Sequence, residues 1–363
     1  MATIHTFRKI FIRTISGAKI QLFFDICNFF CNFAVEMGKE RYFIVRDAAV
    51  PMPQEWHEWD GCPVLTLVAG EEHKTIASLQ RVWDFLMENG ATRSDIVVNI
   101  GGGYISDIGG MAAATYRRGM RYINVPTTLL AMVDASVGGK TGINYRGMKN
   151  YVGVFHAPEE VRLYPHFLRT LPNRELLSGF AELLKTALLD SEQFAGDAMA
   201  WLEDWSEHGW TTDLSERLEG LIRRAVACKE RYVASDPYDQ GLRHALNLGH
   251  TIGHAIEEVQ MGKMPHGYAV MFGLVAELYL SVVLQGLDRR WLQQVTSLMV
   301  SRYHRPECKC SDYNRLITLM HEDKKNEDEE HISFVLLPAI GRPVNAVVSE
   351  TLIREALEYL FSC

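Results

Sequence analysis

The sequence lacks the features that mark secreted, membrane-spanning and nucleic-acid-binding proteins. Its 363 residues carry a formal net charge of −8, which argues against a general nucleic-acid partner. The N-terminus has no secretory signal pattern. The one tempting membrane segment, the apolar run 22–35, is too short to span a bilayer and contains Asp25, Asn28 and Asn32. We therefore expect a cytoplasmic protein without a membrane partner, in which this run forms a buried helix.

The cysteines also lack a pairing pattern. There are seven of them, an odd number, at scattered positions, which argues against a disulfide framework and favours a reducing compartment. Cys308 and Cys310 with His304 resemble a fragment of a metal site, but no second Cys or His pair has matching spacing. We interpret these cysteines as surface thiols.

The chain length favours two domains, and the secondary-structure signals differ between its halves. Strand patterns alternate with helical ones in the first half, which predicts a parallel sheet with crossover helices. The expected strands are 41–45, 64–68, 95–100 and 121–125, and the expected helices between them are 75–89 and 106–116. After Pro172 the expected helices are 174–189, 213–235, 243–259 and 268–284. We predict an α/β domain over 1–168 and a mainly helical domain over 169–363, packed closely because no linker separates them.

The segment from Arg243 to His266 carries the strongest functional signal. If 243–259 is one helix, Arg243, Asn247, His250 and His254 recur at spacings of three and four residues and share a face. Four polar groups on an otherwise apolar helix are costly to bury without a shared partner. A single histidine there would be an ordinary core or surface residue. Two histidines one turn apart, with His266 nearby, favour a site for a divalent metal and an anionic ligand.

A glycine-rich turn follows the strand that ends at residue 100. Gly101, Gly102 and Gly103 precede a helical pattern, and such glycines let backbone amides approach a pyrophosphate at a helix N-terminus. The dinucleotide fingerprint needs a third glycine where this chain has Ser106, so the match is partial. The turn is either a nucleotide site or a tight turn without a ligand.

Several cations outline an anion-binding pocket. Lys140 follows two glycines in a stretch that fails the phosphate-loop pattern, because the first glycine would fall on Asp134. Singly, charged residues on helices are usually solvated. Together they are typical of a site that binds phosphate and carboxylate groups, and the cations concerned are Lys140, Lys149, Lys185, Lys229, Lys324 and Lys325.

Taken in order, these motifs resemble those of the 3-dehydroquinate synthase family, within the sugar-phosphate cyclases. The resemblance runs from about Tyr42 to the C-terminus. It rests on long motifs, namely 70–74, 101–107, 113–119, 125–130, 134–140, 149–150, 170–172, 182–185 and 243–254.

The resemblance implies bound NAD, a catalytic divalent metal (zinc, with cobalt possible), and site residues in three groups. The implied metal ligands are Glu182, His250 and His266, whereas spacing alone would pair His250 with His254. The substrate-contacting positions are Asp134, Lys140, Asn150, Lys185, Lys229, Arg243, Asn247 and His254, with Lys324 or Lys325. The positions around NAD are Asp47, Glu71, Lys74, Gly101, Gly102, Gly103, Asp107, Thr127, Thr128, Lys140, Lys149, Phe167 and Thr170. Arg118 resembles the arginine that reaches a neighbouring subunit's active site, which implies a homodimer.

The reaction of this family converts 3-deoxy-D-arabino-heptulosonate 7-phosphate, a phosphorylated seven-carbon sugar acid, to 3-dehydroquinate and phosphate. By resemblance, NAD oxidises the C5 hydroxyl, phosphate is eliminated, C5 is reduced again, and an aldol step closes the ring. A metal that stabilises the C5 oxygen, cations that hold the anionic groups and a histidine for proton transfer suit this chemistry.

The chain departs from the family pattern at four positions. These are Ser106 in place of a glycine, Met148 before the Lys149–Asn150 pair, Pro237 after Asp236, and Ala49 where asparagine is common. Each can shift a loop or the NAD affinity, but none removes a metal ligand or a charged substrate contact. We therefore expect an active enzyme.

Three other functions compete with this interpretation. A sister cyclase would differ at pocket positions such as Asn150, Asn247 and His254. A metal-dependent polyol or glycerol dehydrogenase would produce NADH, and a catalytically silent binding protein would lack both zinc and NAD-dependent activity. The number of phosphate-binding lysines argues against the dehydrogenase, and the intact charged positions argue against the silent protein.

Overall fold

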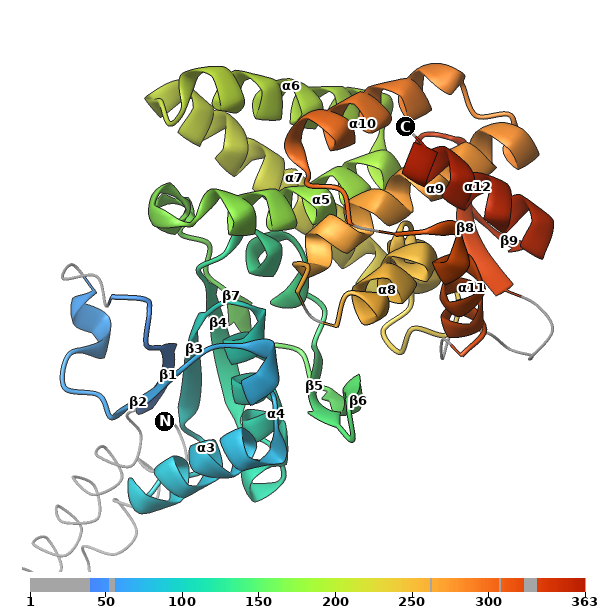
Figure 1. Cartoon of the computed structure of the whole chain (residues 1–363). Helices are drawn as coiled ribbons and strands as arrows, with labels where there is room; N and C mark the ends of the chain where they lie inside the picture. Colours follow the sequence, from blue (N-terminus) through green and yellow to red (C-terminus); the bar gives the residue numbers. More distant parts are fainter. Residues whose placement is uncertain (1–39, 52–55, 262, 307, 323–331, 363) are drawn as a thin grey trace, which may run out of the picture.

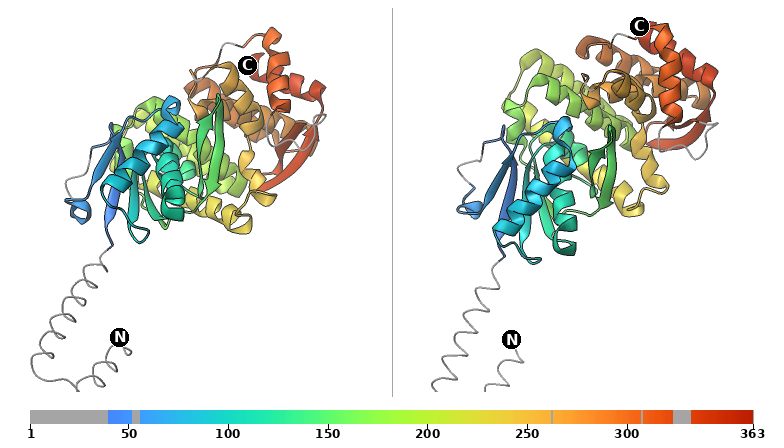
Figure 2. Two further views of the ribbon diagram at one scale, coloured as in Figure 1. Left: turned by 90° about the horizontal axis from the view of Figure 1, so that it is seen from below. Right: turned by 60° about the horizontal axis from the view of Figure 1, so that its bottom comes forward.

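The computed structural model describes residues 40–51, 56–261, 263–306, 308–322 and 332–362. The apolar run 22–35, Lys324 and Lys325 lie outside these described residues, so the expectations for them stay predictions. The described chain forms an α/β part, blue through teal to green in Figure 1, beside a mostly helical part, light green to red. Figure 2 shows the same arrangement from two other directions.

A five-stranded parallel sheet in the order β2-β1-β3-β4-β7 forms the centre of the α/β part. The crossover helices α3 and α4 connect β2 to β3 and β3 to β4, as the alternating pattern predicted. The strands are β1 (Tyr42–Asp47), β2 (Val64–Leu67), β3 (Ile96–Gly101), β4 (Arg121–Pro126) and β7 (Glu160–Val161), and the helices are α3 (Ile76–Glu88) and α4 (Gly103–Thr115). Every residue of β3 is buried, so both faces of the sheet are covered there.

The two faces of the sheet pack against different partners because successive strand side chains point to opposite sides. Phe43, Val97 and Tyr122 pack with α3 and α4. Ile44 and Val98 belong instead to the large core that includes the helices of the second half. One continuous core therefore joins the sheet to the helical part.

The second half of the chain is mainly helical, as predicted. Its helices are α5 (Asn173–Asp190), α6 (Glu192–His208), α7 (Thr212–Ser235), α8 (His250–Val259), α9 (His266–Gln285), α10 (Arg289–Arg302), α11 (Tyr313–His321) and α12 (Glu350–Ser362). Among the described residues, α9 alone is long and apolar enough to cross a membrane, but 78% of its most apolar window is buried inside the protein. It is the central helix of the core, with other helices around it in Figure 1.

The structure also contains two antiparallel hairpins that the sequence patterns did not predict. One pairs β5 (Lys140–Tyr145) with β6 (Met148–Phe155), and the other pairs β8 (Ile332–Ala339) with β9 (Arg342–Val348). Short helical turns lie at His57–Trp59, Glu71–His73, Tyr116–Arg118, Pro165–Thr170, Leu242–Asn247 and Cys310–Asp312, with a π-helical turn at Ala131–Ala135.

The expected single helix over 243–259 is wrong. A 3-10 helix spans Leu242–Asn247, and α8 begins only at His250. Gly249 between them has φ +79°, a left-handed conformation that glycine adopts without strain and that ends a right-handed helix. Arg243 and Asn247 therefore do not continue the helical face of His250 and His254, although the two histidines stay one turn apart on α8.

Candidate metal and nucleotide site

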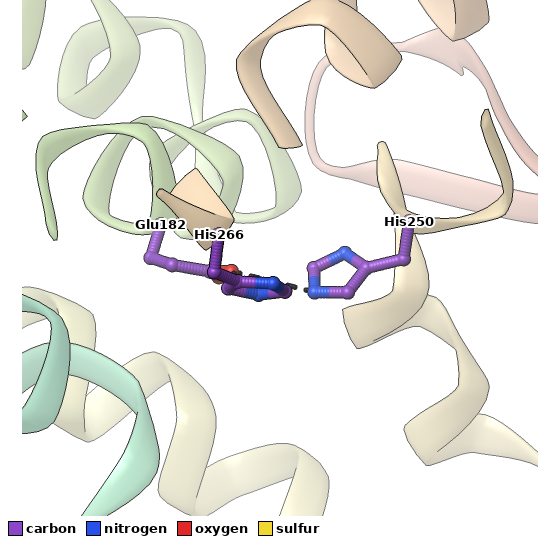
Figure 3. Close-up of side chains that lie close together, drawn as sticks. All are labelled: Glu182, His250 and His266. Carbon is purple, nitrogen blue, oxygen red and sulfur yellow. Dashed lines mark hydrogen bonds and ion pairs between the residues drawn. The ribbon is translucent and has the colours of Figure 1, made fainter. Parts of the chain in front are cut away.

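Three ligand-type side chains from three helices converge in the helical part (Figure 3). Glu182 Oε1 on α5 lies 3.3 Å from His250 Nε2 and 3.1 Å from His266 Nε2. One ligand atom from each residue lies within 4.8 Å of the others, and Glu182 is completely buried. In the described part of the chain, this is the one group of three His, Cys, Asp or Glu side chains that gathers in this way. It is the set that the family resemblance implies, not the His250–His254 pair that spacing favoured.

The Nδ1 atom of each histidine makes a hydrogen bond away from the cluster, and the Nε2 atom faces Glu182. His250 Nδ1 donates to the carbonyl oxygen of Leu248 at 3.0 Å. His266 Nδ1 donates to Glu257 Oε2, also at 3.0 Å. When each ring is neutral with its proton on Nδ1, its Nε2 offers a lone pair, and two imidazole nitrogens with one carboxylate are a usual donor set for a catalytic divalent cation. The residues present therefore fit a metal such as zinc or cobalt.

Glycines bring the three ligand-bearing helices close together. A Cβ at Gly267, directly after His266, would lie 1.8 Å from the Ser178 carbonyl oxygen on α5. A Cβ at Gly273 on α9 would lie 1.9 Å from the Gly249 carbonyl oxygen, just before His250. Only glycine permits either contact, so these two positions fix the separations between α5, α8 and α9.

Groups around the cluster shift the pKa values of His250 and His266 in opposite directions. Burial and the nearby Lys185 lower the pKa of His250 to about 3. Burial also opposes the charged form of His266, but hydrogen bonds with Glu182 and Glu257 outweigh it and raise its pKa to about 10. At neutral pH His250 is thus neutral and ready to bind a cation, whereas a cation would displace a proton from His266.

Two lysines flank the cluster and share one carboxylate, Asp134, on the π-helical turn. Lys185 Nζ lies 2.5 Å from Glu182 Oε2 and 3.8 Å from Asp134 Oδ1. Lys229 Nζ on α7 lies 2.5 Å from the same Asp134 oxygen. Burial lowers the pKa of Lys229 despite this contact, whereas Glu182 and Asp134 outweigh burial and raise the pKa of Lys185. Lys185 therefore stays charged, and Lys229 more readily gives up a proton.

The loop between α7 and the 3-10 helix Leu242–Asn247 supplies partners to two further cationic residues predicted to contact the substrate, Lys140 and Arg243. Lys140 is paired with Asp239, a residue that the sequence patterns did not single out. The guanidinium of the buried Arg243 donates to the carbonyl oxygens of Pro237 and Gly138, both at 3.0 Å. The backbone thus orients Arg243 while its charge remains uncompensated at these contacts.

Predicted nucleotide-site residues meet at the carboxyl edge of the sheet. A Cβ at Gly101 would lie 3.3 Å from the Asp47 Cβ, and Thr127 N donates to the Gly101 carbonyl at 3.0 Å. Gly102, the N-cap of α4, provides no side-chain cap, so the first amides of that helix remain available to a phosphate group. The carboxyl edge of an open parallel sheet is where such folds bind their ligands.

Further residues predicted to lie around NAD, namely Glu71, Lys74 and Asp107, connect the edge of the sheet to the β5–β6 hairpin. Lys74, which is buried, is paired with Asp107 on α4 and donates to the Asn150 side chain. Burial raises the pKa of Asp107 despite its contact with Lys74. Glu71 accepts a 2.8 Å hydrogen bond from the Asn144 side chain on β5.

The remaining predicted positions lie at the margins of these clusters. The His254 ring centroid lies 5.2 Å from that of His250 and 5.9 Å from that of His266. Thr170 Oγ1 donates to the Phe167 carbonyl oxygen at 3.2 Å within the 3-10 helix Pro165–Thr170. Thr128 Oγ1 accepts from Ala131 N, Lys149 pairs with Glu257, and Asn247 ends the 3-10 helix before α8.

Arg118 is not brought to these clusters within one chain. It is exposed in the 3-10 helix after α4, whereas the Gly102–Gly103 end of α4 is the one at the carboxyl edge of the sheet. The 13 residues of α4 separate the two ends by about 20 Å. Its role toward a partner subunit remains a prediction. Cys310 is exposed and Cys308 half-buried, and neither belongs to a metal cluster among the described residues.

Three of the four departures from the family pattern are accommodated locally. Ser106 is buried in α4, and its hydroxyl donates to the Gly102 carbonyl oxygen at 3.4 Å. Ala49 N donates to Asp47 Oδ1 at 3.0 Å in the turn after β1. Met148 is 45% exposed at the start of β6. None of the three side chains disturbs the clusters described above.

Sequence comparisons cover most of the chain. Residues 64–178 match the 3-dehydroquinate synthase N-terminal family, and residues 179–326 match the 3-dehydroquinate synthase C-terminal family. A 3-dehydroquinate synthase from Parabacteroides distasonis is 40% identical over 353 residues, covering 95% of this chain and 98% of that protein. A second, from Pyrococcus furiosus, is 39% identical and covers 80% of this chain and 82% of that protein.

Solved structures give a consistent result. A 2-epi-5-epi-valiolone synthase from Streptomyces hygroscopicus, with NAD+ and Zn2+ bound, aligns with a TM-score of 0.78 and 27% identity, covering 89% of this chain and 91% of that chain. A 2-deoxy-scyllo-inosose synthase complexed with carbaglucose-6-phosphate, NAD+ and Co2+ aligns with a TM-score of 0.74 and 25% identity, covering 88% and 90%. A probable glycerol dehydrogenase from Sinorhizobium meliloti shares only the fold, at 15% identity and a TM-score of 0.57. The two matched family regions and the relatives of nearly full length place this chain in the 3-dehydroquinate synthase family.

Proposed function

We propose that this protein converts 3-deoxy-D-arabino-heptulosonate 7-phosphate to 3-dehydroquinate and phosphate, a lyase reaction that forms a carbocycle in the shikimate pathway. The observation that carries this proposal is 40% identity to a 3-dehydroquinate synthase over 95% of the chain, with a carboxylate and two imidazoles gathered at its centre. We assign NAD binding to residues 1–168 and metal and substrate binding to 169–363. The proposal includes a cytoplasmic homodimer.

Glu182, His250 and His266 would hold the divalent cation. With three protein ligands, a cation keeps positions open for oxygens of the substrate, as catalysis requires. When bound, it would stabilise negative charge on the C5 oxygen of the substrate. The buried setting supports this role because charge interactions are stronger where water is excluded.

NAD would lie along the carboxyl edge of the sheet. Support comes from the uncapped N-terminus of α4, the approach of Gly101 to Asp47, and the buried Lys74–Asp107 pair. The chemistry supplied at this site by bound NAD would be reversible hydride transfer at C5, without net consumption of the cofactor. The chain's own task is to keep this carbon between the two halves of the molecule.

The cations would bind the phosphate and carboxylate of the substrate. Each of these cations already makes an ion pair or a hydrogen bond within the chain; they are Lys140, Lys185, Lys229 and Arg243. An anionic substrate would replace part of these internal contacts, and charge-assisted hydrogen bonds to it are about twice as strong as neutral ones. Arg118 of a partner subunit would add one further cation.

Lys229 and His254 are the groups suited to move protons. The lowered pKa of Lys229, caused by burial, brings its ammonium group closer to the range in which a lysine exchanges a proton. His254 lies beside the rings of His250 and His266, within reach of substrate atoms bound at that cluster. A C5 ketone acidifies the C6 proton, and removal of that proton lets phosphate leave.

Sister cyclases share the fold and the cofactors named for their structures, but they are less similar in sequence. The two such structures are 27% and 25% identical to this chain, compared with 40% for the synthase from Parabacteroides distasonis. Asn150, Asn247 and His254 also keep the residue types of dehydroquinate synthases. These observations favour the seven-carbon acid as substrate.

Phosphate release from this acid and from glucose 6-phosphate tests the substrate assignment. We expect release from the seven-carbon acid only, and none after the metal is removed with a chelator until zinc or cobalt is restored. His250→Ala and His266→Ala should lose both metal and turnover, because each removes one ligand from a set of three. Zinc at wild-type stoichiometry in either variant would overturn the ligand assignment.

A further inference from the structure

Glu257 is a buried carboxylate whose two oxygens have different partners. It lies on α8, two turns after His250, and its side chain is 10% exposed. Glu257 Oε2 accepts the 3.0 Å hydrogen bond from His266 Nδ1, and Oε1 lies 2.5 Å from Lys149 Nζ on β6. The carboxylate therefore stands between a histidine of the cluster and a lysine of the α/β part.

His266 depends on this carboxylate more than His250 depends on any side chain. The backbone carbonyl of Leu248 already holds His250 Nδ1. The His266 side chain is 32% exposed and starts α9, and the one acceptor at its Nδ1 is Glu257. Without that acceptor, the 3.1 Å contact between His266 Nε2 and Glu182 Oε1 alone would orient the ring, and the proton could move from Nδ1 to Nε2. Either change would remove the Nε2 lone pair that a cation at Glu182 and His250 needs.

Lys149 fixes the carboxylate from the opposite side. The neighbouring Asn150 has φ +50°, and its side chain accepts from Lys74, which is paired with Asp107 on α4. The end of the β5–β6 hairpin thus reaches the helical part through Lys149 and the sheet part through Asn150. A shift of the hairpin would move Lys149 and with it the Glu257 carboxylate, which accepts the hydrogen bond from His266.

We propose that Glu257 is a positioning residue that fixes the ring orientation and tautomer of His266 for the divalent cation, with Lys149 holding Glu257 in place. The inference rests on the proposed function, because it requires a cation at Glu182, His250 and His266. It assigns no contact between Glu257 and the substrate. Its effect should therefore appear first in metal retention.

Glu257→Ala and Glu257→Gln, compared with Glu258→Gln, test this assignment. Glu258 is the next residue on α8 and is exposed, so its variant controls for the loss of one negative charge. Zinc affinity is measured by competition with a chromogenic chelator, and the absorption spectrum of the Co2+-loaded protein reports the ligand geometry. We expect Glu257→Ala to lose roughly 10- to 100-fold in zinc affinity and to change the cobalt spectrum. Glu257→Gln, which keeps an acceptor for His266 Nδ1, should lose less, and Glu258→Gln should match the wild type.

The outcomes separate this inference from the proposed function. A wild-type protein that binds no zinc or cobalt would refute the metal assignment itself. A wild type that binds zinc, with both Glu257 variants within about twofold of it, would overturn the positioning role alone. If Glu257→Ala does not fold by circular dichroism, the nearly isosteric Glu257→Gln decides: a loss of zinc affinity relative to Glu258→Gln supports the role, and equal affinity contradicts it.

Discussion

Replacing Gly267 by alanine should push α9 away from α5 and move His266 relative to Glu182. The new Cβ would lie 1.8 Å from the Ser178 carbonyl oxygen and 2.5 Å from its carbonyl carbon, both backbone atoms of a buried helix. Because those atoms cannot rotate away, the start of α9 must move by about 1.5 Å to restore ordinary contact. Overpacking of this kind costs on the order of 1–3 kcal/mol. The ligands of a site need to be held within roughly 0.5 Å, so the displacement exceeds what the cluster tolerates.

Urea denaturation, zinc competition and turnover measure the effect. Gly267→Ala should lower the denaturation midpoint, weaken zinc binding, and reduce kcat/KM by on the order of 100-fold, the loss expected for a misplacement of about 1 Å. Gly220→Ala on α7 is the matched control, since no atom beyond the neighbouring backbone of α7 lies within 4 Å of the position its Cβ would take. There the helix should gain roughly 0.5–1 kcal/mol. If Gly267→Ala kept wild-type zinc affinity, the α5–α9 contact would not set the ligand separation.

Two further predictions follow from the charged residues of the site. Burial raises the pKa of Asp134, but Lys229 and Lys185 outweigh it and hold the pKa at about 2, below the ordinary 3.8. Its ionised form therefore stabilises the fold at neutral pH, and this contribution is lost as pH falls from about 4 toward 2. Asp134→Asn should show a shallower loss of thermal stability over that interval, and an unchanged acid limb would contradict the pairing. Arg118→Ala and Lys140→Ala should each be inactive yet retain zinc, whereas mixed subunits should regain partial activity if Arg118 acts across an interface. No recovery after verified subunit exchange would place Arg118 in its own chain's function.

Four of the five strands of the sheet were predictable because they carry strong β-branched signals, whereas the two-residue β7 (Glu160–Val161) was not predicted. The β-branched runs that became β1, β2, β3 and β4 are short and are bounded by helical or turn patterns. The β5–β6 hairpin was missed, since its turn residues Arg146 and Gly147 have φ +49° and +83°, and arginine is unusual at such a position. The apolar run of β8 reads equally well as buried helix or strand, because periodicity does not separate the two over so few residues.

The candidate site was predictable where it depends on residue type and not where it depends on helix packing. Spacing paired His250 with His254, whereas the other two ligand-type side chains are His266 on α9 and Glu182 on α5, and only the family motifs pointed to Glu182. Glu257 and Asp239 were missed because their lysine partners lie 108 and 99 residues away in the sequence. The apolar pattern predicted one uninterrupted helix over 243–259, but the left-handed conformation of Gly249 separates it into two helices.

The balance of phosphate and NADH during turnover tests the central claim most directly. Purified protein loaded with zinc and a catalytic amount of NAD is mixed with 3-deoxy-D-arabino-heptulosonate 7-phosphate, and phosphate, 3-dehydroquinate and NADH are measured together. Cofactor recycling at one carbon predicts equal amounts of phosphate and 3-dehydroquinate, many turnovers per NAD, and no accumulation of NADH. NADH formed in proportion to substrate consumed, without 3-dehydroquinate, would contradict the cyclase assignment and identify a dehydrogenase.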